Sequence, residues 1–362
     1  MMIIPIYQPS LGGKEKEYVN KCLDTTWISS KGEFISKFEE SFSKYIGAKY
    51  STTVCNGTVA LHLALEALGI GVGDEVIVPS LTYIASVNTI MQTGAKVVFV
   101  DSELDTWNID IQDVRRKITC KTKAIMVVHL YGLPCNMDSI KSLCDNNSLL
   151  LIEDCAEAFG SKLNGRHVGT FGDVSTFSFF GNKTITTGEG GMVVCRDKEI
   201  YEKACHLKNQ GVSASREYWH DILAFNYRMT NICAAIGLAQ LERADQIIEK
   251  KRSISDWYKL YLKDLPLSIH HEYDGATHSY WMCSILVNDS NQRDPLRKYL
   301  KGHNIETRPV FPPSHLMPHC FSPEVFPIAE SISISGINLP SYPDLIEEDI
   351  KMISVHIRNF FS

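Results

Sequence analysis

One lysine lies between two apolar segments of the chain. Residues 176–180 form a short aromatic run typical of a strand, and residues 192–195 form a second apolar run. Burial of Lys183 between them would penalise its ammonium and lower its pKa from about 10.4. An amine that can lose its proton can attack a carbonyl carbon and carry protons. The alternative is a structural lysine that pairs with Glu189, and this segment alone fits both.

A second group of residues could bind an anion. Asn56, Gly57 and Thr58 precede a run whose apolar residues recur on one helical face. Asn56 or Thr58 can cap that helix, and Gly57 would let a ligand approach the backbone closely. The free N–H groups of a helix start bind phosphate well. The alternative is simply a well-capped helix.

Further polar or aromatic residues follow apolar runs. Tyr83 comes shortly after residues 75–78, and Asp154 and Glu157 follow residues 149–153. A partly desolvated carboxylate such as that of Asp154 needs a cationic partner. The alternative is a carboxylate that caps a helix or accepts hydrogen bonds from loop amides.

The elements that must position these residues alternate between strands and helices. Apolar runs without polar alternation are typical of strands buried on both faces, and helical patterns lie between them. This order predicts an α/β protein with a mostly parallel sheet covered by helices, with ligands at the carboxyl ends of the strands. The runs at 75–78, 96–100, 124–130 and 149–153 are the predicted strands, and 109–118 and 137–144 the helices.

The second half of the chain indicates another, smaller domain. A long helix is predicted from residue 232 to about 262, so we expect a large domain at 1–245 and a small one at 246–362. A strand is expected at 280–287, whereas 307–313 is too rich in proline for a central strand. Residues 210–218 and His270–His271 are expected in solvated loops.

Composition excludes several classes of protein. The net charge is −6 without a basic block, so we expect no nucleic-acid partner. We find no signal peptide and no stretch long enough to cross a membrane, which predicts a cytoplasmic protein. The eleven cysteines are scattered without a Cys-x-x-Cys pair, and the histidines lack ligand spacing. Reduced thiols and no metal site are therefore expected.

Together these groups are the parts that a pyridoxal 5'-phosphate (PLP) site needs. The phosphate would take the helix start at Asn56, and the ring of Tyr83 would stack on the pyridine. Asp154 would pair with the protonated pyridine nitrogen. Lys183 would bond to the cofactor and relay protons.

The lysine segment also carries a resemblance to a known family. Residues 177–183 read FSFFGNK and 187–191 read TGEGG. They resemble the cofactor-lysine signature of the DegT/DnrJ/EryC1/StrS sugar aminotransferases. The similarity runs from residues 7–10 to 337–340. It implies a fold-type I PLP enzyme, with a large domain whose mostly parallel sheet lies between helices and a smaller C-terminal α+β domain.

The resemblance also implies roles for individual residues. Lys183 matches the Schiff-base lysine, Asp154 the partner of the pyridine nitrogen and Tyr83 the stacking aromatic. The phosphate-binding positions match Gly57, Thr58 and Ser178. Asn226 matches an asparagine that reaches the phosphate of the neighbouring subunit, which implies a homodimer with shared active sites, or a higher oligomer.

Other positions are less well defined. Many relatives carry histidine or glutamine where this chain has Glu157, beside the phenolic oxygen of the cofactor. A carboxylate there must be protonated or paired. Arg228, Arg308 and His315 are candidates for binding the nucleotide diphosphate or the glutamate carboxylate, or for structural ion pairs.

The implied reaction is transamination. Relatives that remove a sugar hydroxyl carry histidine in place of Lys183. In a ping-pong cycle, L-glutamate would donate its amine, which would then pass to the C4 ketone of a nucleotide sugar. Residues 26–32, 227–233 and 306–311 resemble the branch that acts on GDP-4-keto-6-deoxy-D-mannose. The alternatives are another nucleotide or C3 amination, a non-catalytic binding protein of this fold, and a merely structural lysine.

Overall fold

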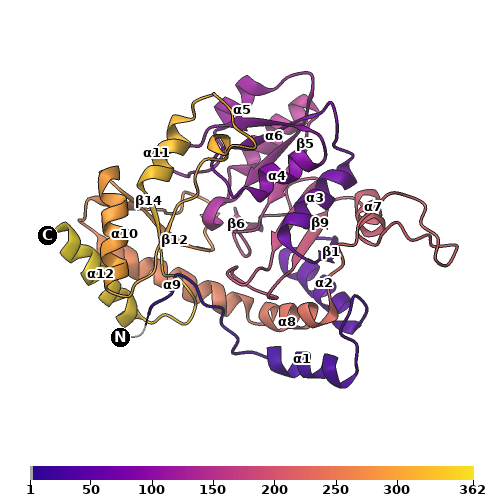
Figure 1. Cartoon of the computed structure of the whole chain (residues 1–362), viewed down its shortest axis with the longest axis horizontal. Coiled ribbons are helices and arrows are strands. Elements are labelled where there is room, and N and C mark those ends of the chain that lie inside the picture. Colours follow the sequence, from indigo (N-terminus) through magenta and orange to yellow (C-terminus); the bar gives the residue numbers. More distant parts are fainter. Residues whose placement is uncertain (1–2) are drawn as a thin grey trace.

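The central sheet has seven strands in the order β1-β9-β8-β5-β4-β2-β3. Figure 1 labels β1, β5 and β9 of this sheet, which lies among the helices. The computed structural model describes residues 3–362. The strands are β1 (Tyr50–Val54), β2 (Glu75–Pro79), β3 (Lys96–Val100), β4 (Thr122–Val128), β5 (Leu150–Asp154), β8 (Val174–Ser178) and β9 (Gly191–Cys195). Strands β3, β2, β4, β5 and β8 are parallel, and β9 is antiparallel to both of its neighbours. The expected α/β fold with a mostly parallel sheet is confirmed.

Alternate residues of each strand pack on opposite faces of this sheet. In β4, Met126 and Val128 belong to the apolar core under one face, and Ile125 and Val127 to a core under the other. Burial on both faces explains why the strands read as unbroken apolar runs. One face is covered by α3 (Gly57–Leu68), α4 (Ala85–Gln92) and α7 (Lys198–Lys208), and the other by α2 (Glu33–Ile46), α5 (Ile111–Lys117), α6 (Met137–Asn147) and α8 (Asn231–Leu241).

A second sheet lies toward the C-terminal end of the chain. Its antiparallel strands are ordered β10 (Leu267–Ile269), β12 (Cys283–Val287), β14 (Gly336–Leu339) and β13 (Arg308–Pro309). As expected from its proline, β13 is an edge strand. This sheet packs with α9 (Ala244–Leu262), α10 (Arg293–Gly302) and α12 (Glu347–Phe361) around a core of its own.

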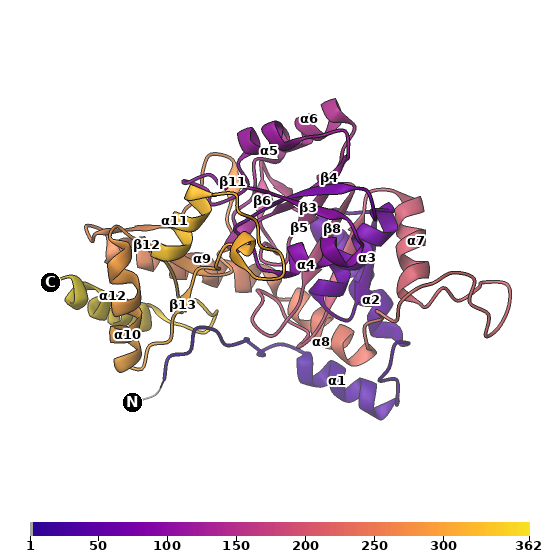
Figure 2. The ribbon, with the colours of Figure 1, turned by 45° about the horizontal axis from the view of Figure 1, so that its top comes forward.

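Several segments join the two parts. Ile4 bridges to Ile305, and the chain then crosses beneath the molecule to α1 (Glu15–Asp24) (Figure 2). Helix α11 (Pro327–Ser335) adds Ala329 and Ile332 to the core of the large sheet. A small sheet joins β11 (Ala276–Thr277) to β6 (Lys162–Leu163) and β7 (Arg166–His167). The division at residue 245 remains a prediction, and it falls at the start of α9.

The helix predicted over 232–262 is wrong in one respect, because it is broken between α8 and α9. Arg243 leaves the helical conformation, with φ −115° and ψ 10°. The buried Gln240 donates to Ser10 O at 2.8 Å and to Glu15 Oε1 at 2.6 Å. These contacts with the N-terminal segment accompany the break and could not be read from local periodicity.

Two expectations for the small domain also need correction. His270 is buried rather than solvated, and its ring stacks on Trp107 at 4.2 Å. The strand expected from residue 280 begins only at Cys283, because Tyr280 has a φ of +49°. Among the described residues, no helix combines the length and the apolar character needed to cross a bilayer.

Candidate active site

A cavity of about 490 Å³ lies beyond the carboxyl ends of β5 and β8. It brings together most of the residues singled out from the sequence, namely Asn56, Gly57, Thr58, Tyr83, Asp154, Glu157, Ser178 and Lys183. Trp281 and Phe311 line it from segments beyond residue 245. Sequence reasoning assigned neither of these aromatic residues to the site, since it gave their segments as a strand and as a proline-rich connection that resembles one branch of the family.

The start of α3 forms one wall of the cavity. Asn56 is its N-cap, as predicted, and the Asn56 side chain accepts a hydrogen bond from Val59 N at 3.0 Å. Gly57 lies against Ser178 so closely that a Cβ on Gly57 would be 2.7 Å from the Cβ of Ser178. The first N–H groups of a helix have no partner within the helix. This wall therefore offers N–H groups and a hydroxyl to an anion.

Asp154 ends β5 and is buried. Its Oδ2 accepts a hydrogen bond from Ser86 Oγ at 2.8 Å, and its Oδ1 accepts one from Ala156 N at 3.0 Å. Burial raises the pKa of this carboxyl, and these hydrogen bonds and the charge of Lys183 oppose the rise. A cationic N–H placed beside Asp154 would supply the partner that this carboxylate needs.

Lys183 lies in the turn that follows β8, and its side chain is half-buried beside the cavity. Burial lowers the pKa of the Lys183 amine, whereas the charges of Glu157 and Asp154 oppose that change. Its Nζ lies 3.8 Å from the ring centroid of Trp281. Glu189 is exposed, and the ion pairs of the described residues do not include one between it and Lys183. The geometry thus favours the chemical over the structural interpretation of this lysine.

Glu157 faces the same cavity. Its Oε2 accepts a hydrogen bond from Tyr131 N at 2.7 Å. Tyr131 has a φ of +54°, an uncommon conformation for a tyrosine. Burial raises the pKa of Glu157 to about 7, against the opposing effect of the Lys183 charge. Glu157 can therefore hold or release a proton near neutral pH.

Four of the residues considered from the sequence do not line this cavity. Asn226 is exposed and accepts a hydrogen bond from the half-buried Arg228, whose Nε lies 2.9 Å from Asn226 Oδ1. Arg308 is exposed on the edge strand β13. His315 is buried, with its Nδ1 2.6 Å from Ser80 Oγ and its Nε2 3.3 Å from Glu330. These contacts give His315 a structural explanation.

Three buried side chains near the end of β5 have the chemistry to bind a metal. Atoms of His129, Glu153 and Cys155 lie within 4.8 Å of one another. The carboxylate of Glu153, however, already accepts hydrogen bonds from the N–H groups of Gly169, Phe171 and Gly172, at 2.6 to 2.7 Å. His129 Nε2 lies 3.1 Å from Glu153, and its Nδ1 accepts a hydrogen bond from Cys135 N. Hydrogen bonding within the protein accounts for this cluster.

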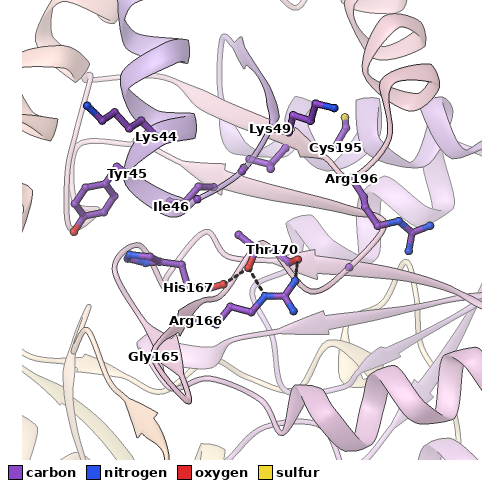
Figure 3. Close-up of a pocket in the computed structure, with 15 residues that line it drawn as sticks. Lys44, Tyr45, Ile46, Lys49, Gly165, Arg166, His167, Thr170, Cys195 and Arg196 are labelled. Carbon is purple, nitrogen blue, oxygen red and sulfur yellow. Dashed lines mark hydrogen bonds between the residues drawn. The ribbon is translucent and has the colours of Figure 1, made fainter.

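A second pocket, of about 430 Å³, lies near the end of α2 (Figure 3). Lys44, Lys49, Arg166 and Arg196 line it, but their charged ends diverge. Arg196 pairs with Asp173 at 2.6 Å, and Arg166 donates to Thr170. The negative end of the α2 dipole also opposes anion binding there. The first cavity is therefore the better active site.

The residues of the first cavity fit PLP. The N–H groups at the start of α3 and the nearby Ser178 hydroxyl line the cavity and can bind a phosphate, and Asp154 can accept a hydrogen bond from a pyridinium. The amine of Lys183 can react with an aldehyde. Such a site, at the carboxyl ends of a mostly parallel sheet, defines a PLP-dependent aminotransferase of fold type I.

Comparison with known proteins agrees with this class. The model of the DegT/DnrJ/EryC1/StrS aminotransferase family matches residues 9–358, and the chain belongs to this family. The chain is 59% identical to a GDP-perosamine synthase of Escherichia coli O157:H7 over the full length of both. It resembles the aminotransferase TlmJ of Streptoalloteichus hindustanus, with a TM-score of 0.95, 30% identity and 99% of each chain covered. The PLP form of the putative sugar aminotransferase Spr1654 of Streptococcus pneumoniae is also similar, with a TM-score of 0.94, 26% identity and full coverage of both chains. The protein is a PLP-dependent sugar aminotransferase.

Proposed function

We propose that the protein transfers the amino group of L-glutamate to C4 of GDP-4-keto-6-deoxy-D-mannose. The products are 2-oxoglutarate and GDP-perosamine, a precursor for O-antigen lipopolysaccharide. The main support for this reaction is that Lys183, Asp154 and the start of α3 all line one cavity. The choice of sugar rests on full-length similarity to a protein named GDP-perosamine synthase.

Each residue of the site has a task that its surroundings favour. PLP supplies an electron sink that stabilises negative charge on the substrate carbon. Asp154 keeps a proton on the pyridine nitrogen, and Asn56, Gly57, Thr58 and Ser178 hold the phosphate. Tyr83 covers one face of the ring. The Nζ of Lys183 would move a proton between the substrate carbon and the cofactor, which requires the lowered pKa that burial gives this amine.

We place Glu157 beside the phenolic oxygen of the cofactor, where its raised pKa lets it share a proton. We retain Arg228 and Arg308 as candidates for the diphosphate or the glutamate carboxylate. His315 remains in that role only as the sequence prediction, because its own contacts lie outside the cavity.

The proposed assembly is a homodimer with shared sites. Asn226 lies outside the cavity of its own chain, and the preceding loop projects from the body of the protein beyond α7 (Figures 1 and 2). Tyr218 and Leu223 of this loop are more than nine-tenths exposed. Such apolar exposure suits a partner subunit. We place the reaction in the cytoplasm, in keeping with eleven free cysteines.

A spectroscopic assay tests the substrate. Purified protein loaded with PLP is treated with L-glutamate until its visible band is lost, and is then freed of amino acid. Keto sugars linked to guanosine, thymidine or uridine diphosphate are added separately. We expect only the GDP-linked 4-keto-6-deoxy sugar to restore the band and yield an amino sugar by mass spectrometry.

The outcomes separate the alternatives. Recovery of the band only with thymidine- or uridine-linked sugars would contradict the proposed guanosine nucleotide. An amine at C3 of the product would contradict the proposed amination at C4. Lys183→Ala should lose turnover in this assay. Full turnover by that variant would remove Lys183 from the chemistry.

A further inference from the structure

Trp281 reaches the cavity from the smaller part of the molecule. It lies two residues before β12, directly after Tyr280, whose left-handed backbone turns the chain. Its indole is 4% exposed and joins the core of the large sheet rather than the small one. The ring stacks on Tyr131 at 5.8 Å, with 10° between the planes. Trp281 is therefore fixed in orientation, as a positioning group must be.

This indole makes two contacts with the turn that carries the reactive lysine. Its Nε1 donates to Asn182 O at 2.6 Å. Its ring face lies under the Lys183 amine, with 3.8 Å from Nζ to the ring centroid. The next carbonyl in the chain, that of Lys183, accepts from Tyr7 OH at 2.6 Å. Two aromatic side chains thus hold adjacent peptide groups, but only Trp281 also contacts the amine.

We propose that Trp281 is a positioning residue for Lys183. The indole N–H of Trp281 holds the turn, and the ring face of Trp281 holds the free amine of Lys183. An ammonium over an indole is stabilised by the negative face of the ring, most strongly where water is excluded. The amine of Lys183 needs such a stabilising contact whenever it is not bonded to the cofactor. The inference rests on the proposed role of Lys183 and goes beyond it. The simpler alternative is that Trp281 only fills space between the two sheets.

Labelling of the cofactor-free protein distinguishes these interpretations. Lys183 is acetylated with a trace of acetic anhydride at a series of pH values, and the modified peptide is quantified by mass spectrometry. The pH midpoint of labelling reports the pKa of the amine whether or not the lysine is catalytic. A failure of this proposal is therefore distinct from a failure of the proposed function.

Four variants define the expected result. Trp281→Leu should lower the midpoint by about half a unit to one unit, since the ammonium loses the ring. Trp281→Phe, which keeps a weaker ring face, should lower it by less. Tyr7→Phe removes only a hydrogen bond to the turn and should leave the midpoint in place. Trp257→Phe, at a partly buried tryptophan that packs against the core of the small sheet, is the control for tryptophan loss.

An unchanged or higher midpoint in Trp281→Leu would overturn the proposal, as would an equal fall in Tyr7→Phe. Circular dichroism shows whether Trp281→Leu folds, and Trp281→Phe alone decides the case if it does not. In the loaded enzyme we expect Trp281→Phe to lower kcat several-fold with KM for L-glutamate nearly unchanged. A change confined to KM would contradict positioning of the lysine.

Discussion

At the scale of residues, the site depends on two titratable groups that burial drives toward their neutral forms. Burial lowers the pKa of the Lys183 amine and raises that of the Glu157 carboxyl, and each charge opposes the other's shift. The protonation state of each group therefore depends on the charge of the other. Such coupling suits groups that exchange protons during a reaction.

The raised pKa of Glu157 has a consequence for stability. Between pH 4.5 and about 7, the folded chain holds a proton on Glu157 that the unfolded chain has lost. The free energy of unfolding must then fall as pH rises through this window. Glu157→Gln should reduce that fall by up to about 3 kcal/mol. Urea unfolding of the cofactor-free wild type and variant at several pH values measures this change in the free energy of unfolding.

Glu189→Gln, which changes an exposed carboxyl of the same cavity, is the matched control and should keep the wild-type dependence on pH. An equal dependence in wild type and Glu157→Gln would show that Glu157 is ionised throughout this range.

At the scale of elements, the sequence predicted the strands of the central sheet other than β1, because burial on both faces leaves unbroken apolar runs. Asn56, Asp154 and Lys183 were found for the same reason, since each adjoins a strongly patterned segment. Trp281 and the break at Arg243 were not predicted, because each depends on partners far away in the chain, namely the Asn182 turn and Ser10. Local periodicity carries no information about such contacts.

The start of α3 allows a test of the phosphate site. A methyl group at Gly57 would meet Ser178, so Gly57→Ala must displace one of them. The helix itself should tolerate alanine, which has the higher helix propensity. We expect the Kd for PLP to rise about 10- to 100-fold with little change in thermal stability. Equilibrium dialysis of the cofactor measures this.

Gly302→Ala provides the comparison, since a Cβ at Gly302 meets no atom of residues 3–362 within 4 Å and the residue lies in α10, outside the cavity. An unaltered Kd for PLP in Gly57→Ala would show that the start of α3 does not bind the phosphate of the cofactor.

At the scale of the whole molecule, the site of a single chain is open on one side. Tyr83 is 57% exposed although it lines the cavity, and Asn226 lies outside it. The projecting loop before Asn226 (Figure 2) carries apolar side chains that are exposed rather than packed in a core. In the proposed homodimer, a second copy of the chain would cover these surfaces and bring its own Asn226 to the phosphate.

Mixing of inactive variants tests this assembly. Lys183→Ala removes the reacting amine from one chain, and Asn226→Ala removes the group proposed to serve the neighbouring site. If sites are shared, half of the sites in a hybrid dimer carry both defects and the other half carry neither. Each variant alone should then be strongly impaired, whereas subunit exchange should restore about a quarter of wild-type activity. If Asn226 serves its own chain, every site in a hybrid has one defect. Activity after exchange would then stay at the mean of the two variants.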